Sequence, residues 1–166
     1  MNQPIRMTRT ILMVVAVVFC FTGVAAAQGA QKIDACTLLT KAQIQAALGQ
    51  SVGDGKLNAK ANPAVGAPCE YVIGDYGVFS ILVKAIGPGE TADKMMAELK
   101  KMKIAVSDAP GIGDRSFFSS PGYGMVQLNT FKGPRYLIIV MLVPGATEAA
   151  QKTAAEKLMR DALAKI

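Results

Sequence analysis

Alternating apolar and polar residues, interrupted by short turns, constrain the fold of this chain more than any other feature. Residues 69–73 and 79–85 alternate on either side of Gly74-Asp75-Tyr76-Gly77, which predicts a β-hairpin. Further strands are predicted at 115–118, 125–131 and 136–143, separated by turns that contain glycine and proline. Because these connections are too short to hold crossover helices, neighbouring strands should pair antiparallel.

Three helices are predicted around these strands from their capping residues and apolar periodicity. Thr40 and Gln43 form a capping box before 41–48, and Gly49 is the expected left-handed stop. The second helix has apolar residues at helical spacing, namely Ala92, Met95, Met96, Leu99 and Met102. Thr147 caps a third helix that runs to the C-terminus.

These elements predict an α+β domain with the order α-ββ-α-βββ-α. In this arrangement a twisted antiparallel sheet carries the helices packed on one face. The segment 50–68 is rich in glycine and proline and is interpreted as a loop, with a short strand near 56–58 as an option.

The first 27 residues have the features of an export signal. Arg6 and Arg9 precede the uncharged apolar run 11–24, and Ala25-Ala26-Ala27 provides the small residues that signal peptidase requires, so cleavage is expected before Gln28. The remaining residues 28–166 are enough for one domain. The alternative, an uncleaved membrane anchor, is less favoured because spanning a bilayer takes about 20 apolar residues.

Two of the three cysteines remain after signal removal. Cys36 and Cys69 form an even pair in an oxidising compartment, which predicts a disulfide; two free thiols are the alternative. Closing a loop of about 34 residues would stabilise the fold by roughly 3.8 kcal/mol in chain-entropy terms. The protein is therefore expected in the periplasm or outside the cell.

The composition excludes several function classes. The chain contains no histidine, which removes His-based triads, His-ligated zinc and His-ligated haem. Without Arg6 and Arg9 the 18 basic residues become 16 against 12 acidic ones, so the net charge falls from +6 to +4. Nucleic acid is not an expected partner, because the protein is exported and its lysines are dispersed. The one basic cluster, Lys100, Lys101 and Lys103, is predicted to be the solvated end of a helix.

A search for catalytic motifs gives little. The segment 111–116 begins like a dinucleotide fingerprint but lacks the third glycine and precedes a strand, so no cofactor is predicted. The cysteines are expected to be oxidised and no calcium-loop pattern occurs, so no metal is predicted. Asp108 and Asp114 flank one loop and offer a pair of carboxylates as a remote catalytic alternative.

One group of arginine and aromatic residues near strand ends has the composition of a recognition surface. It contains Arg115, Phe117, Phe118, Tyr123, Arg135 and Tyr136, of which Arg115, Phe118, Tyr123 and Arg135 are the candidate binding patch. Ordinary core and surface packing is the alternative. The sequence therefore favours a non-enzymatic exported module that binds a protein or an envelope component. A small carboxylate-dependent hydrolase and a structural accessory subunit of an envelope complex are the other hypotheses.

Three short motifs support a resemblance to a family. The stretch DACTLLTKAQIQAALG with its cysteine, the tripeptide CEY with the second cysteine, and PGIGDRSFF together resemble an uncharacterised family of small exported bacterial domains, best known among actinobacterial lipoproteins. The resemblance implies a Cys36–Cys69 disulfide, a compact α+β fold and a location outside the cytoplasmic membrane, but no activity. This chain lacks the lipobox of the lipoproteins.

Overall fold

A computed structural model describes residues 33–61 and 66–166. The predicted signal sequence, 1–27, and its cleavage site before Gln28 lie outside the described residues. Within the described ranges, no helix has the length and apolar character needed to cross a membrane.

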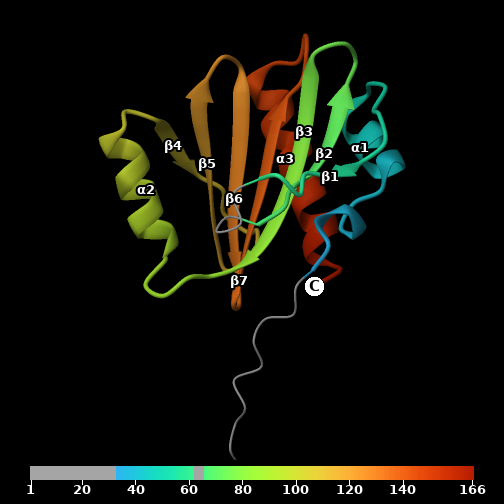
Figure 1. Ribbon diagram of the computed structural model, residues 1–166. Helices are drawn as coiled ribbons and strands as arrows, with labels where there is room; N and C mark the ends of the chain where they lie inside the picture. Colours follow the sequence, from blue (N-terminus) through green and yellow to red (C-terminus); the bar gives the residue numbers. More distant parts are fainter. Residues whose placement is uncertain (1–32, 62–65) are drawn as a thin grey trace, which may run out of the picture.

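The elements follow one another in the order α-βββ-α-ββββ-α, and the predicted α+β class is confirmed (Figure 1). In chain order they are the 3-10 turn η1 (Ala35–Thr37), α1 (Lys41–Leu48), β1 (Lys56–Leu57), β2 (Cys69–Ile73), β3 (Gly77–Ala85), α2 (Ala92–Lys101), β4 (Ala105–Asp108), β5 (Arg115–Gly122), β6 (Met125–Lys132), β7 (Arg135–Leu142) and α3 (Glu148–Leu163).

All strands belong to one antiparallel sheet with the order β1-β2-β3-β7-β6-β5-β4. The hairpins β2–β3, β5–β6 and β6–β7 form at the predicted turns. The last strand, β7, pairs with β3 over eight residue pairs and so joins the two halves of the chain. Both long hairpins, β2–β3 and β5–β6, therefore turn at the same end of the sheet, which is the upper end in Figure 1.

The main hydrophobic core lies on one face of the sheet, called the back face here. This face carries Phe79, Leu128 and Ile139, and α3 and α1 cover it. Strand alternation explains why these side chains are buried together, since every second residue of adjacent strands points to the same face. Tyr71 belongs to this core and donates a hydrogen bond from its hydroxyl to the Leu39 carbonyl at 3.0 Å.

Helix α2 packs on the opposite face, so the prediction that the helices share one face is wrong. A second hydrophobic cluster holds it there, formed by Phe117, Phe131 and Tyr136 with Met95 and Leu99. The rings of Phe131 and Tyr136 stack at 4.7 Å between centroids. The physical reason is that the neighbours Phe117 and Phe118 are both buried, which requires a cover on both faces of β5.

Two short strands complete the sheet beyond the predicted order. Strand β1 pairs with β2 through Lys56 and Leu57, in the segment where a short strand was an option. Strand β4 pairs with β5 at the other edge. Its residues are mostly exposed, so the sequence carries no alternation that would indicate a strand there.

The predicted disulfide and the predicted helix ends are confirmed. Cys36 and Cys69 form a disulfide that joins η1 to β2. Thr40 and Gln43 make both hydrogen bonds of the capping box at the start of α1, and Gly49 ends the helix with φ of +65°. Thr91 and Thr147 cap α2 and α3.

Candidate functional site

The sequence-predicted patch is not assembled into one surface. Arg115 begins β5 and Tyr123 lies in the turn that follows it, so a strand of eight residues, roughly 23 Å, separates them. Arg115 lies beneath α2, where it is 2.9 Å from Asp108 and 3.7 Å from Asp93. The pairing of Arg115 with two acids makes it a link between β5, the end of β4 and α2.

The other two patch residues lie elsewhere again. Phe118 is only 4% exposed, belongs to the back-face core, and has Lys152 over its ring at 5.4 Å. Arg135 is at the same end of the sheet as Arg115, but alternation along β7 places it on the back face, two residues from Leu137. The predicted patch of Arg115, Phe118, Tyr123 and Arg135 is therefore corrected, because alternation and hairpin geometry distribute these four over two faces, two ends and the core.

Alternation from Cys69 predicts that Tyr71 points inward, and the neighbours Pro121, Gly122 and Gly124 predict an exposed Tyr123 at a loop tip. Tyr71 is 3% exposed and Tyr123 is 99% exposed, so this predicted contrast is confirmed. The glycine-rich segment before Arg115 leads directly into β5, so no helix N-terminus follows it.

The face that α2 partly covers, called the front face here, presents side chains in rows that run across the strands. The row nearest the hairpin turns is apolar and consists of Val72, Val78 and Leu142 from three adjacent strands. Val72 is 59% exposed, whereas Val78 and Leu142 are half-buried. Two strand spacings of about 4.8 Å make this row roughly 10 Å long.

The next row of the front face is mainly polar. It contains Glu70, Ser80, Val140 and Gln127, which the strand register places opposite one another. Rows on the same face are about 7 Å apart, so an apolar row and a mainly polar row run side by side across the part of the sheet that α2 does not cover. Val72 is exposed there, and the other members of the two rows are half-buried.

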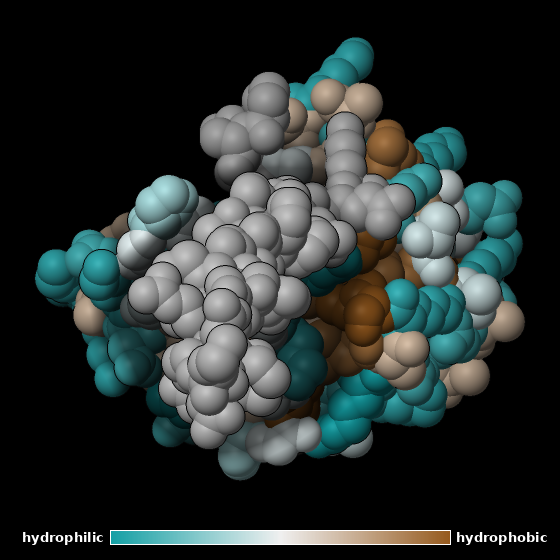
Figure 2. Space-filling view, turned by 90° about the horizontal axis from the view of Figure 1, so that it is seen from below, coloured by the Kyte–Doolittle hydropathy of each residue, from teal (hydrophilic) through white to brown (hydrophobic). Residues whose placement is uncertain are grey.

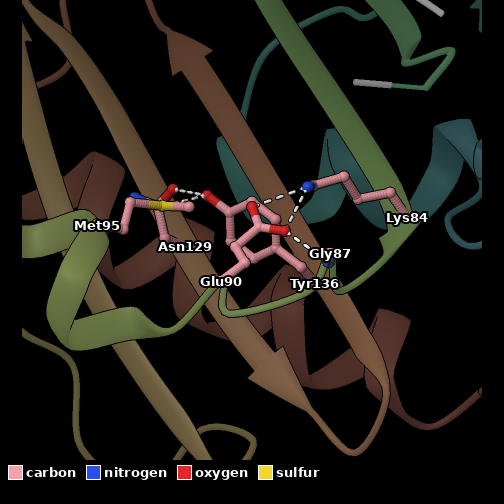
Figure 3. Close-up of polar contacts among 6 residues, drawn as sticks. All are labelled: Lys84, Gly87, Glu90, Met95, Asn129 and Tyr136. Carbon is pink, nitrogen blue, oxygen red and sulfur yellow. Dashed lines mark hydrogen bonds and ion pairs between the residues drawn. The ribbon is translucent and has the colours of Figure 1, made fainter. Parts of the chain in front are cut away.

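A buried polar network lies between this open part and α2 (Figure 3). The Tyr136 hydroxyl donates to Oδ1 of Asn129 at 2.5 Å. Nε2 of Gln127 donates to the same oxygen at 2.7 Å. The Tyr136 oxygen also lies 2.9 Å from Sδ of Met95 in α2. Asn129 Nδ2 completes the network by donating to Ser119 Oγ at 3.3 Å. Every buried side-chain N or O in the described residues has a hydrogen-bond partner.

The segment that enters α2 is anchored beside this network (Figure 3). Lys84 Nζ lies 2.7 Å from a Glu90 carboxylate oxygen and 5.4 Å from the centre of the Tyr136 ring, and the Gly87 N–H donates to the same carboxylate. Burial raises the pKa of Glu90, but the hydrogen bonds from Lys84 and Gly87 and the charge of Lys84 outweigh it and lower that pKa. Burial, with the nearby charge of Glu90, strongly raises the pKa of Tyr136.

A hollow of about 240 Å³ lies at the β1–β2 side of the front face. Its walls are formed by Gly53, Asp54, Lys56, Glu70, Tyr71, Val72 and Val78. Val72 and Val78, which belong to the apolar row, form one side of this hollow. Glu70 accepts a hydrogen bond from the Asn58 side-chain amide at 2.9 Å. From the end opposite the hairpin turns, Figure 2 shows an apolar patch to the right of the grey atoms, bordered on its right by hydrophilic side chains.

The carboxylates with shifted pKa values are all held in the ionised form. Hydrogen bonds from Lys132 and the Gly133 N–H lower the pKa of Asp114. Hydrogen bonds from Lys152 and Ser120 lower the pKa of Glu148. Asp108 and Asp114, the candidate carboxylate pair, have separate cationic partners, Arg115 and Lys132. Within residues 33–61 and 66–166 no group of three acidic or cysteine side chains is arranged to hold a metal ion.

The front face therefore brings together an apolar row, a mainly polar row and a hollow in one part of the described molecule. Sequence reasoning missed it because the rows are formed by residues distant in the chain. Alternation along the strand places Gln127 and Asn129 on one face, and two polar side chains on that face indicate that it is not part of a purely apolar core. Comparison with protein-family models, with curated proteins and with solved structures found no match to this chain.

Proposed function

We propose that this protein is a non-enzymatic exported binding module that holds an amphipathic ligand on the front face of its sheet. The observation that carries the proposal is the apolar row of Val72, Val78 and Leu142 beside the row that contains Glu70, Ser80 and Gln127. The first row suits an apolar group about 10 Å long, and the second provides hydrogen-bond donors and acceptors about 7 Å away.

The exposure of Val72 supports this choice. A sheet face with partly exposed apolar side chains and polar groups at its border is typical of a recognition surface, and burying it against a ligand is favourable. The buried network of Tyr136 and Asn129 fixes the wall that α2 forms, which reduces the ordering cost of binding.

The proposal is tested with the anionic apolar dye 1-anilinonaphthalene-8-sulfonate as the probe. The folded protein should enhance the fluorescence of the dye, and Val78→Asp, which puts a negative charge into the apolar row, should weaken binding of the anionic dye at least about tenfold. The matched control is Thr153→Asp, which adds the same charge at an exposed position of α3. Equal affinity of both variants, with unchanged circular dichroism, would rule out the front face.

A photo-crosslinking amino acid at position 72 then identifies the natural ligand. Crosslinks formed in the host envelope from position 72, and absent from position 153, are expected. A hydrolase would instead need a carboxyl group that stays protonated near neutral pH, and the shifted carboxylates here have lowered pKa values. If the protein were an accessory subunit, it would co-purify with its complex in fixed stoichiometry, and position 72 would crosslink to another subunit.

A further inference from the structure

Three exposed large side chains project from one end of the molecule. Tyr76 is 75% exposed in the β2–β3 turn, Met102 is 61% exposed after α2, and Tyr123 is 99% exposed in the β5–β6 turn. These three turns, 74–76, 102–104 and 121–124, form the tip end of the molecule. None of these side chains belongs to the rows of the front face.

The strand register explains why these turns share one end. Val78 of β3 pairs with Leu142 at the end of β7, and Val126 at the start of β6 pairs with Met141, so both hairpin turns lie beyond the same end of β7. Ala105 pairs with Ser120, which brings the α2–β4 turn to that end too. In Figure 1 the two hairpin turns lie at the upper edge, and the α2–β4 turn lies lower, at the upper left. Three strand spacings put the two hairpin turns roughly 14 Å apart.

The hairpin turn that carries Tyr123 holds its side chain away from the domain. Gly122 pairs with Met125, so Tyr123 and Gly124 form a two-residue turn, and their φ values of +56° and +75° are the positive values that a type I′ turn requires. Asparagine, aspartate and glycine are the usual residues of such a turn, so a tyrosine is an uncommon choice there. Its side chain is 99% exposed, so packing inside the described molecule does not account for it.

Positive charge accompanies one of these three side chains, Met102. Lys100, Lys101 and Lys103 are exposed around Met102, as predicted from the sequence. Glu98 is 2.7 Å from Lys101, and Glu148, at the start of α3 beside Ser120, is 2.7 Å from Lys152. Lys100 and Lys103 have no acidic partner among the described residues, whereas Asp75, beside Tyr76, is an exposed acid within the tip end.

We infer that the tip end docks the protein on the surface of a bilayer that contains anionic phospholipids. Tyrosine is favoured at the membrane–water interface, and methionine can enter the acyl boundary, while lysines beside them meet lipid phosphates. Three separate projections at one end suit a flat and deformable surface, whereas a protein partner would need a separate pocket for each. This site is independent of the proposed ligand face.

The first test uses sedimentation with vesicles of phosphatidylcholine alone or of phosphatidylcholine with phosphatidylglycerol in equal parts. Binding is expected only with the anionic lipid and should fall as salt is added. The double variant Lys100→Gln/Lys103→Gln should weaken binding about 25-fold, since each lysine contributes about fivefold. The matched control Lys60→Gln/Lys94→Gln removes the same charge away from the tip end and should change binding little.

The second test uses fluorescence, because the sequence contains no tryptophan. Tryptophan at position 123 or 76 should shift its emission to the blue on anionic vesicles, whereas Leu57→Trp, at the exposed β1 edge, should not. The inference is overturned by absent vesicle binding, by equal losses in both double variants, or by equal shifts at positions 123 and 57. Dye binding at the front face should be unchanged in the tip-end variants, so the two proposals can fail separately.

Discussion

The Tyr136 hydroxyl and the Asn129 side-chain oxygen are joined by a 2.5 Å hydrogen bond between adjacent strands, directly beneath α2. Both residues are buried, and they are diagonal neighbours on the front face. The bond therefore fixes the floor on which α2 rests and the border of the open rows.

Removing this hydroxyl should destabilise the fold. Tyr136→Phe keeps the stacked ring but leaves Asn129 with fewer partners, so the free energy of unfolding should fall by about 1–2 kcal/mol. Urea unfolding measures the change. The control Tyr76→Phe alters an exposed hydroxyl and should not change the free energy of unfolding measurably. An equal loss in both variants would show that the hydrogen bond to Asn129 does not stabilise the fold.

The ion pair of Glu90 with Lys84 should make stability depend on acid pH. The folded-state pKa of Glu90 is lowered from 4.5, so its contribution is fully present above about pH 4.5 and is lost as the pH falls through the folded value. Glu90→Gln should flatten this part of the profile of unfolding free energy against pH. Asp54→Asn, at an exposed pair with Lys41, serves as the control and should leave the profile unchanged.

Loss of the disulfide should cost more than any of these changes. Cys69→Ala opens the loop that contains α1 and β1, and the free energy of unfolding should fall by ~2–5 kcal/mol. Reduction of the unaltered protein should produce a loss of similar size. If the folded protein purified from the host has two thiols that react with iodoacetamide, the bridge is not formed there.

Tyr123 and Arg115 should both tolerate truncation. Tyr123→Ala removes a side chain without packing partners, and Arg115→Ala removes exposed ion pairs, so each should change the free energy of unfolding by less than about 1 kcal/mol. Thermal unfolding tests both. A large loss for Arg115→Ala would mean that its contacts with Asp108 and Asp93 are important in holding α2 on the sheet.

Local features of this fold could be predicted from the sequence because their causes are local. The capping box at Thr40, the turn at 74–77 and the alternation of 125–131 depend on residues within a few positions of one another. The pairing of Cys36 with Cys69 was predictable because they are the two cysteines outside the predicted signal sequence.

Features that depend on distant residues could not be predicted in this way. Helix α2 covers the front face because its methionines contact the front-facing side chains of β5 and β7. One of these contacts joins Met95 to Tyr136, which are 41 positions apart in the sequence. Strand β4 carries no burial pattern, so only its pairing with β5 identifies it. The candidate patch failed for the same reason, since composition near turns does not determine which end or face a side chain occupies.

Helix α2 rests on a hydrophobic cluster separate from the one that holds α1 and α3 to the back face. Lifting α2 would expose only the smaller cluster, which costs less free energy than global unfolding. Backbone amides of α2 should therefore exchange their hydrogens with solvent through a sub-global opening, ahead of those of α3. When α2 opens, more of the front face becomes accessible. A molecule that binds the uncovered face would shift the equilibrium between the closed and open positions of α2 while the rest of the domain stays folded.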